Sequence, residues 1–214
     1  MLGTPKRDRT RERREATRRE ILDAAWDLAR EVGIAGITLR DIARRVGMQA
    51  PSLYGHFASK HAIYDAMFGQ AWSEYERVAE KDLAQLPDDP RSAVRTMSRT
   101  FFDFAVADLP RYQLMNQRTI PGFEPSPASY ALAQEAYARG FAPLEALVEL
   151  RQDDRDLITA IAAGLLGQQL ANDAGGTRWV RLIDDVVDLL VPRLEARSRP
   201  PAPSGDRSGE ETAS

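Results

Sequence analysis

Apolar residues recur along most of this 214-residue chain at the spacing of an α-helix. The first series has its members three or four positions apart and stops before Gly33: Ile21, Ala25, Leu28 and Val32. No stretch shows the sustained apolar–polar alternation of a half-buried strand. The pattern therefore predicts an all-α fold.

Capping residues and prolines divide this pattern into successive helices. Thr38 precedes a second helix that ends before Gly47, and a very short third helix begins near Pro51. Ser59 precedes a long fourth helix, and later helices are expected to begin at Pro90 and Pro127, each after a capping side chain. The segment 117–127, rich in proline and glycine, is expected to be a loop, and Pro143 to kink or split the helix that follows. The last two long helices are predicted over 153–174 and 177–196.

The segment from Thr38 to Lys60 has the pattern of a helix-turn-helix. Such a motif needs two short helices joined by a tight turn, with the first turn of the second helix free to meet DNA bases. Gly47 can adopt the left-handed conformation that ends the first helix. The residues expected to pack inward are Ile42, Ala43, Val46, Met48, Leu53 and Phe57. This register leaves outward Ala50, Pro51, Ser52 and Tyr54.

Charge is distributed unevenly along the chain. Residues 1–60 carry 13 Lys and Arg against 8 Asp and Glu, whereas the whole chain has a net charge of −3. A basic N-terminal region followed by an acidic remainder is typical of a module that binds a polyanion. A charged surface that is merely exposed to solvent would give the same numbers of charged residues. The Arg-rich segment 1–16 is predicted to be a mobile basic arm, and the low-complexity residues 198–214 a disordered tail.

Composition also excludes several classes of site. The chain has no cysteine and only two histidines, His56 and His61, so disulfides and thiolate metal sites are excluded and no metal or cofactor is expected. No catalytic set of residues is evident, and the acidic pairs at 153–154 and 184–185 suit a solvated helix face, so an enzyme is not expected. No apolar run approaches the ~20 residues of a membrane span, and no signal peptide is evident. We therefore expect a cytoplasmic protein.

Residues 21–67 resemble the TetR family of bacterial repressors. The matching positions, at fixed spacing, are Ile21-Leu22-Asp23-Ala24-Ala25, Gly36, Thr38, Arg40, Ile42-Ala43, Gly47, Leu53-Tyr54, His56-Phe57 and Lys60. The resemblance implies four parts: the arm, a three-helix DNA-binding domain at 17–64, a larger helical bundle at 65–197 for ligand binding and dimerisation, and the tail. It also implies these DNA-binding residues: Thr38, Arg40, Gln49, Ala50, Pro51, Ser52, Tyr54, His56 and Lys60.

Individual roles follow from the same resemblance. Arg40 corresponds to a position that reaches a guanine edge, and Ala50 stands where an amide reads adenine in a relative, so the base preference should differ there. Pro51 corresponds to a methyl reader, whereas Ser52, Tyr54 and Lys60 correspond to phosphate contacts. His56 is either a packed or a phosphate-adjacent histidine. Arg44 and Arg45 either contact DNA or are solvated.

The second half suggests dimerisation. Small residues follow one side of the helix predicted at 153–174, where they allow another helix to approach closely, and an apolar face follows on the helix predicted at 177–196. The predicted interface residues are Ala160, Ala163, Gly164, Gly167, Ala171, Trp179, Ile183, Val187 and Leu190. The resemblance implies a homodimer, and burial within one chain is the alternative.

Aromatic and methionine residues along the middle helices suggest a ligand cavity, although ordinary core gives the same pattern. With a few polar anchors, the candidate lining residues are Met97, Phe101, Phe104, Met115, Arg118, Tyr137, Phe141, Gln168 and Asn172. The resemblance then implies a repressor that a small apolar or amphipathic effector releases from palindromic double-stranded operator DNA. The alternatives are a transcription activator, or a helical protein that binds small molecules or proteins and contacts DNA only secondarily.

Overall fold

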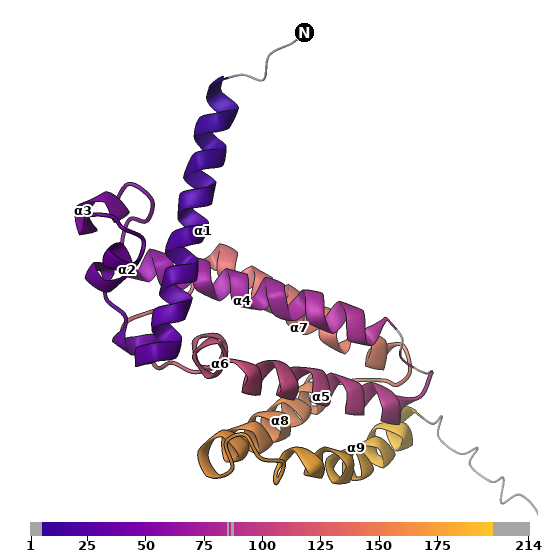
Figure 1. Cartoon of the computed structure of the whole chain (residues 1–214). Helices are drawn as coiled ribbons and strands as arrows, with labels where there is room; N and C mark the ends of the chain where they lie inside the picture. The colour runs from indigo at the N-terminus through magenta and orange to yellow at the C-terminus, as the bar shows by residue number, and fades with distance from the viewer. Residues whose placement is uncertain (1–5, 85, 87, 199–214) are drawn as a thin grey trace, which may run out of the picture.

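The computed structural model describes residues 6–84, 86 and 88–198, and all regular structure within them is helical. The α-helices, shown in Figure 1 with their connecting 3-10 turns, are α1 (Lys6–Val32), α2 (Leu39–Arg45), α3 (Ala50–Leu53), α4 (Lys60–Leu83), α5 (Pro90–Ala107), α6 (Leu109–Asn116), α7 (Pro127–Glu145), α8 (Gln152–Asn172) and α9 (Ile183–Ser198). The 3-10 turns are η1 (Ile34–Gly36) and η2 (Val180–Leu182). The predicted all-α fold is confirmed.

Helix α1 is longer than the apolar pattern predicted. Residues 6–16, expected to be a mobile arm, continue the helix so that it projects beyond its neighbours (Figure 1). Arginine and glutamate are good helix formers, and an Arg11–Glu15 ion pair of 3.6 Å lies along the helix surface. Residues 1–5 and 199–214, which include the rest of the arm and the predicted tail, lie outside the described residues. At the other end of α1, Val32 is 58% exposed, so its predicted place on the buried face is wrong.

Side-chain caps begin most helices where the sequence predicted them. The side chains of Thr38, Ser59, Asp89 and Ser126 each accept a hydrogen bond from the backbone three residues on. Each bond satisfies a backbone N–H that would otherwise lack a partner at the first turn of a helix. The predicted loop before Pro127 is present, and α7 is not split, because it continues through Pro143 to Glu145.

Two boundaries differ from the prediction. Helix α6 was not predicted; it starts after Asp108, whose carboxylate accepts a bond from the backbone N–H of Arg111 at 3.2 Å. The last helix does not begin at residue 177. The Asp173 carboxylate accepts a bond from the Arg178 N–H at 2.7 Å, and Gln169 Oε1 accepts one from the Trp179 N–H at 2.9 Å. These bonds hold the segment as a turn until η2 begins.

Two hydrophobic clusters hold the helices together. The first joins α1, α2 and α3 to the start of α4, to α6 and to α7, and the second joins α5, the end of α7, α8 and α9. Helices α4 and α7 lie side by side along the molecule (Figure 1). The first cluster therefore continues from the predicted DNA-binding part into the larger bundle. Among the described residues, no helix is long and apolar enough to cross a bilayer.

Candidate nucleic-acid interface and ligand cavity

The turn between α2 and α3 has the geometry of a helix-turn-helix. Gly47 has a φ of +69°, and the backbone N–H groups of Met48 and Gly47 donate to the carbonyls of Ala43 (2.8 Å) and Arg44 (3.3 Å). These paired bonds reverse the chain directly after the helix, and the left-handed glycine makes them possible. The predicted inward residues are buried or half-buried: Ile42, Ala43, Val46, Met48, Leu53 and Phe57.

The start of α3 presents its side chains to solvent. We call this surface, made of Gln49, Ala50, Pro51, Ser52 and Tyr54, the reading face. Ala50 is half-buried and the other four are exposed, Tyr54 by 58%. The exposed Gln49 side chain does not cap the helix, so its amide is available to an external partner. The structure thus brings these five predicted residues together on one surface.

The three arginines of α2 differ in their surroundings. Arg44 pairs with Asp41 at 2.8 Å and Arg45 pairs with Glu31 at 2.7 Å. Arg40 is exposed and makes no hydrogen bond or ion pair with any described residue. Arg40 is therefore the guanidinium on α2 that is free to meet DNA without first breaking an internal contact.

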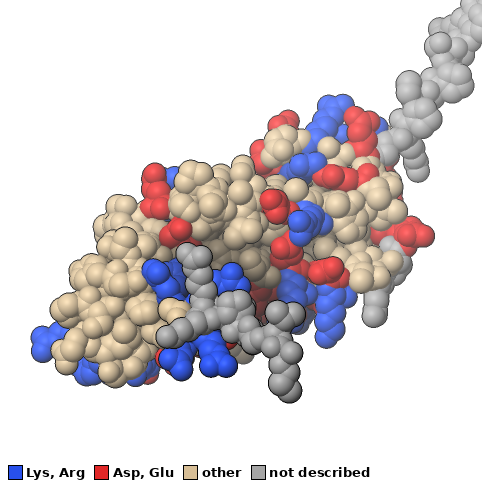
Figure 2. All heavy atoms as spheres, turned by 90° about the horizontal axis from the view of Figure 1, so that it is seen from above, with Lys and Arg blue, Asp and Glu red and all other residues tan. Residues whose placement is uncertain are grey.

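The helical extension of α1 is fastened to the turn that follows α3. Arg14 donates to the carbonyl of Gly55 at 3.1 Å, and Arg18 donates to the carbonyl of His56. The Arg18 guanidinium also lies 3.9 Å from the centre of the Phe57 ring. Figure 2, which looks down on this end of the molecule, shows basic side chains gathered around the start of the chain. The extension thus adds positive charge beside the reading face.

Lys60, His56 and Thr38 belong to the segments that flank α2 and α3 in the chain. Lys60 is the first residue of α4, lies 5.3 Å from the Tyr64 ring centre, and has a pKa lowered by burial. His56 is half-buried, and its Nδ1 has no hydrogen-bond partner among the described residues. Thr38 caps α2 through the Asp41 N–H at 3.2 Å. Within the described residues, no group of three His, Asp or Glu side chains is placed to hold a metal ion.

A cavity of about 250 Å³ lies inside the larger bundle, between α4, α5, α6, α7 and α8. Four of the predicted ligand residues line it: Met97, Phe101, Tyr137 and Phe141. The sequence did not point to the rest of its wall, which includes Trp72, Tyr75, Tyr112, Asn116 and Thr159. The positions of Trp72, Tyr75 and Ala79 on one side of α4 are a periodic signal that could have indicated this wall.

Five predicted ligand residues lie outside the cavity. Phe104 and Met115 are buried in the first hydrophobic cluster. Arg118 has a side chain 90% exposed and pairs with Glu124 at 3.6 Å. Gln168 and Asn172 are one helical turn apart and bond to each other at 2.7 Å on the exposed side of α8. The prediction that these five line the cavity is wrong.

The predicted dimer residues divide into two groups. On α8, Ala160, Ala163, Gly164 and Ala171 are exposed and Gly167 is half-buried, as is Trp179 before α9. In contrast, Ile183, Val187 and Leu190 are buried in the second hydrophobic cluster of their own chain, so their predicted place in an interface is wrong. Helix α9 packs against α5, and among its described residues Leu189 is a large apolar side chain that is exposed, at 77%.

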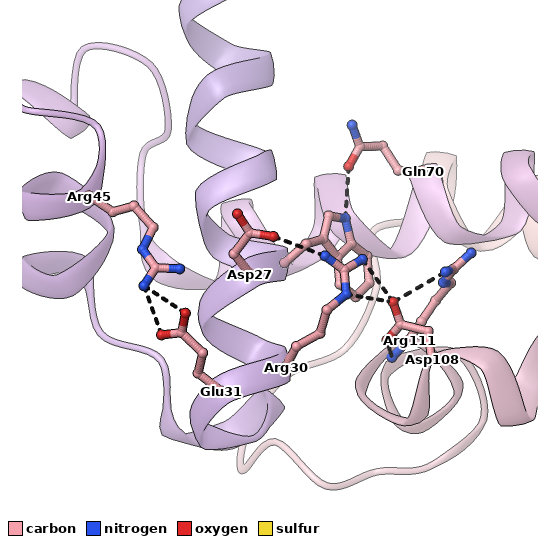
Figure 3. A network of polar contacts seen from close by, with 8 residues as sticks. Asp27, Arg30, Glu31, Arg45, Gln70, Asp108 and Arg111 are labelled. Atoms are coloured by element: carbon pink, nitrogen blue, oxygen red, sulfur yellow. Dashed lines mark hydrogen bonds and ion pairs between the residues drawn. The ribbon is translucent and has the colours of Figure 1, made fainter. Parts of the chain in front are cut away.

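A polar network joins α1 to α6 (Figure 3). The Asp108 carboxylate, with a side chain only 3% exposed, accepts from Arg30 Nε at 3.0 Å and Nη2 at 2.8 Å. It also accepts from Arg111 Nη2 at 3.2 Å, and Arg111 pairs with Glu74 of α4 at 2.9 Å. The network ties the helix that supports α2 and α3 to a helix that lines the cavity.

The fold and its turn define a helix-turn-helix protein, and comparison with known proteins identifies the family. The model of the bacterial regulatory proteins, tetR family, matches residues 21–67. The tetracycline repressor protein class A of Escherichia coli is 30% identical over 159 residues, which cover 73% of this chain and 71% of that protein. This chain therefore belongs to the tetR family of bacterial regulatory proteins.

Solved structures show the same fold at lower identity. A TetR family transcription regulator from Marinobacter aquaeolei has a TM-score of 0.64 at 16% identity, covering 85% of this chain and 97% of that one. The TetR family transcriptional regulator PfmR from Thermus thermophilus has a TM-score of 0.57 at 23% identity, covering 88% and 97%. Both confirm a larger helical body attached to the helix-turn-helix.

Proposed function

We propose that this protein is a cytoplasmic repressor that binds a palindromic DNA operator as a homodimer and leaves it when a small molecule fills the cavity. The observation that carries the proposal is the exposed reading face beside the unpaired Arg40. The matched E. coli protein is named a tetracycline repressor, and a shorter match is the transcriptional regulator TtgR of Pseudomonas putida. These names support regulation of transcription, not catalysis, for this chain.

The DNA contacts are proposed residue by residue. Arg40 reads a guanine, because a guanidinium matches the two acceptors on its major-groove edge. Ala50 and Pro51 are apolar and half-buried or exposed at the start of α3, which suits contact with a thymine methyl. Ser52, Tyr54 and Lys60 bind phosphates, with Thr38, Gln49 and His56 at the edge of the same surface. The arginines of the α1 extension add further phosphate contacts.

The homodimer interface is proposed on α8 and the outer side of α9. The exposed residues Ala160, Gly164 and Ala171 recur on one side of α8, where small side chains let a partner helix approach. Leu189 adds an exposed apolar residue on α9. In the dimer, the two copies of α3 would lie one DNA turn apart, roughly 34–36 Å, to match the half-sites of a palindrome.

Release would begin at the cavity. Helix α6 supplies Tyr112 and Asn116 to the cavity wall, and its first-turn cap, Asp108, holds Arg30 of α1. A ligand that favours a different position of α6 therefore changes how the domain predicted at residues 17–64 sits on the body at 65–197. Because the coupling is reciprocal, such a ligand must bind the DNA-bound form less tightly.

In-vitro selection of DNA bound by the full chain tests the proposal, and we expect a palindrome. With the selected site, Arg40→Ala should relax the base preference at one position per half-site. Lys60→Ala should instead weaken all sequences alike and reduce the salt dependence by about one phosphate contact. Arg44→Ala is the matched control, because Arg44 is already paired with Asp41. Equal, sequence-independent losses for Arg40→Ala and Lys60→Ala would refute the role of Arg40, and selection of no palindrome would refute the repressor dimer.

A further inference from the structure

None of the described residues that line the cavity carries a carboxylate, ammonium, guanidinium or imidazole group. Its 18 lining residues are apolar, aromatic or neutral polar, from Trp72 on α4 to Ala163 on α8. An ionised ligand would lose its water here without meeting an opposite charge, which is strongly unfavourable for a carboxylate or phosphate. Asp82 does not line the cavity, but its carboxylate accepts a hydrogen bond of 2.8 Å from the hydroxyl of the lining residue Thr100. This nearby charge is negative. The wall therefore selects against anions.

Aromatic rings make up much of the wall. Six lining residues carry them: Trp72, Tyr75, Phe101, Tyr112, Tyr137 and Phe141. Trp72, Tyr75, Phe101 and Tyr112 pack edge to face in series, with ring centres 5.9 Å apart for Trp72–Tyr75 and 5.6 Å for Tyr75–Phe101, and Tyr137 and Phe141 form a separate tilted pair. Another flat ring can join such a set by the same offset or edge contacts. The wall suits a planar aromatic ligand.

Several hydrogen-bond donors of the wall have no partner in the described chain. Tyr112 is only 5% exposed, yet no described residue accepts a hydrogen bond from its hydroxyl. The indole N–H of Trp72, a residue 9% exposed, is buried without a partner among the same residues. By contrast, the Tyr137 hydroxyl bonds to Thr159 at 3.2 Å. A buried donor without a partner is costly, so the Trp72 N–H favours a ligand that brings an acceptor, and the Tyr112 hydroxyl is a second donor without a partner among the described residues.

Tyr75 belongs to the same wall. Burial raises the pKa of its phenol to about 12, so the hydroxyl keeps its proton at neutral pH and remains a donor. Like Tyr112, it makes no hydrogen bond to a described residue through its hydroxyl. The cavity of about 250 Å³ is just below the ~300–1,000 Å³ typical of small-molecule sites, which favours a compact ligand.

We infer that the cavity takes a neutral, planar aromatic molecule of about two fused rings that bears an acceptor oxygen, such as a ketone or quinone, and that Tyr112 donates to this oxygen. The inference rests on the proposed function only in treating this cavity as the effector site. Carboxylates and metal chelates are excluded by the uncharged wall. An aromatic wall can also hold a quaternary ammonium, but no carboxylate lines it to balance the charge.

Calorimetric titration of the full chain with four matched probes tests the inference. The probes are 2-acetylnaphthalene, its alkene analogue 2-isopropenylnaphthalene, the anion 2-naphthoate and a naphthyl trimethylammonium cation. We expect the ketone to bind at least about tenfold more tightly than each of the others, one hydrogen bond or one buried charge being enough for that ratio. Equal or tighter binding of the anion or the cation overturns the inference, as does failure of the ketone to bind at its solubility limit.

Variants then test the donor. Tyr112→Phe should remove most of the ketone's advantage over the alkene and leave the alkene's affinity unchanged. Tyr130→Phe is the matched control, because Tyr130 is 52% exposed and does not line the cavity. If Tyr112→Phe weakens ketone and alkene alike, the residue acts through packing and its assignment as donor is refuted. Trp72→Phe, measured in parallel, shows whether the indole N–H shares the acceptor.

Failure of the inference and failure of the proposed function give different results. DNA selection without any probe tests the regulator alone. A protein that binds the ketone but no specific DNA would refute the repressor and keep the ligand assignment. A protein that binds a palindrome but none of the neutral probes would refute the ligand assignment and keep the repressor.

Discussion

Replacing Asp108 with asparagine tests how α1 is held to the rest of the molecule. The carboxylate is 3% exposed and receives two hydrogen bonds from Arg30 and one from the Arg111 side chain. Asparagine has nearly the same shape, and its Oδ1 can still accept from the Arg111 N–H, so the cap on α6 is retained. The substitution removes the charge and, with Oδ1 kept at the cap, places the Nδ2 amide where Oδ2 accepts from Arg30 and Arg111, so those three hydrogen bonds are lost as well.

The size of the effect follows from the surroundings of the two arginines. Removing one partner of a fully buried ion pair lowers the free energy of unfolding by roughly 3–5 kcal/mol. A hydrogen bond to a charged group contributes about 1.5–3 kcal/mol to that free energy. Here Arg30 is 48% exposed and water can replace its lost partner, while Arg111 keeps Glu74 at 2.9 Å. We therefore expect Asp108→Asn to lower the free energy of unfolding by about 2 kcal/mol. Asp108→Ala should cost about 1 kcal/mol more, because the cap is lost as well.

Urea unfolding at one fixed protein concentration measures this effect. Asp27→Asn is the control: Asp27 contacts the same Arg30 at 3.1 Å but is 57% exposed, so its loss should cost under ~0.5 kcal/mol. The double variant with Arg30→Gln should be less destabilised than the sum of the single variants. If Asp108→Asn behaves like the control, or if the two losses simply add, the network does not hold α1 to α6.

Three further predictions concern the turn, the dimer and the tyrosines. Gly47→Ala should destabilise the protein by about 1–2 kcal/mol in thermal or urea unfolding, because the left-handed backbone at φ +69° is unfavourable for a residue with a Cβ. Gly164→Arg should convert the dimer to monomer in sedimentation, since it places a long charged side chain on the small-residue side of α8. Absorbance at 295 nm should show Tyr64 and Tyr75 losing their protons near pH 12, because burial raises the pKa of each phenol from the ordinary value of 10 to about 12. Because the unfolded chain releases these protons first, stability should be constant below pH 10 and fall from pH 10 to 12.

Each of these predictions has its own check. Gly140→Ala, inside α7 with open space around its Cβ, should not destabilise the chain, and an equal effect at Gly47 and Gly140 would exclude backbone strain as the cause. Ala138→Arg on the exposed side of α7 should leave sedimentation unchanged; a dimer that survives Gly164→Arg contradicts the α8 interface. One transition near pH 10 for all six tyrosines would contradict the raised pKa values.

Local signals in the sequence predicted local structure well. A capping hydroxyl or carboxylate, a following proline and a left-handed glycine each act within one helical turn, so Thr38, Gly47 and Asp89 could be read from their neighbours. Asp108 is the same kind of signal, followed by Pro110 two positions later, but it lies between apolar residues that continue the pattern of the helix before it. Missing α6 also hid Tyr112 and Asn116 from the predicted cavity.

The sequence indicated which faces of a helix are apolar or polar more clearly than which helix or side chain each face contacts. An apolar face on α9 indicates burial but does not say whether another helix of the same chain or a second chain covers it; in the structure α9 packs against α5, and Val187 is buried in the second hydrophobic cluster. Gln168 and Asn172 have the chemistry of ligand anchors, but they are one turn apart on one helix and satisfy each other. The arginine-rich start of α1 lacks apolar residues, yet Arg14 and Arg18 find backbone carbonyls far away in sequence, at Gly55 and His56.

The packing of α4 and α6 explains how one ligand could act on a distant DNA surface. The first hydrophobic cluster runs without a break from Leu53 beside the reading face, through Met67 on α4, to Leu114 on α6. The same two helices also line the cavity, through Tyr75 on α4, which packs against this cluster, and through Tyr112 on α6. Because a close-packed interior shifts between discrete arrangements and does not deform freely, we expect a ligand that shifts α4 and α6 to shift α1 to α3 as well. The predicted division at residue 64 therefore falls within one packed unit, and this continuity is what the proposed release of DNA requires.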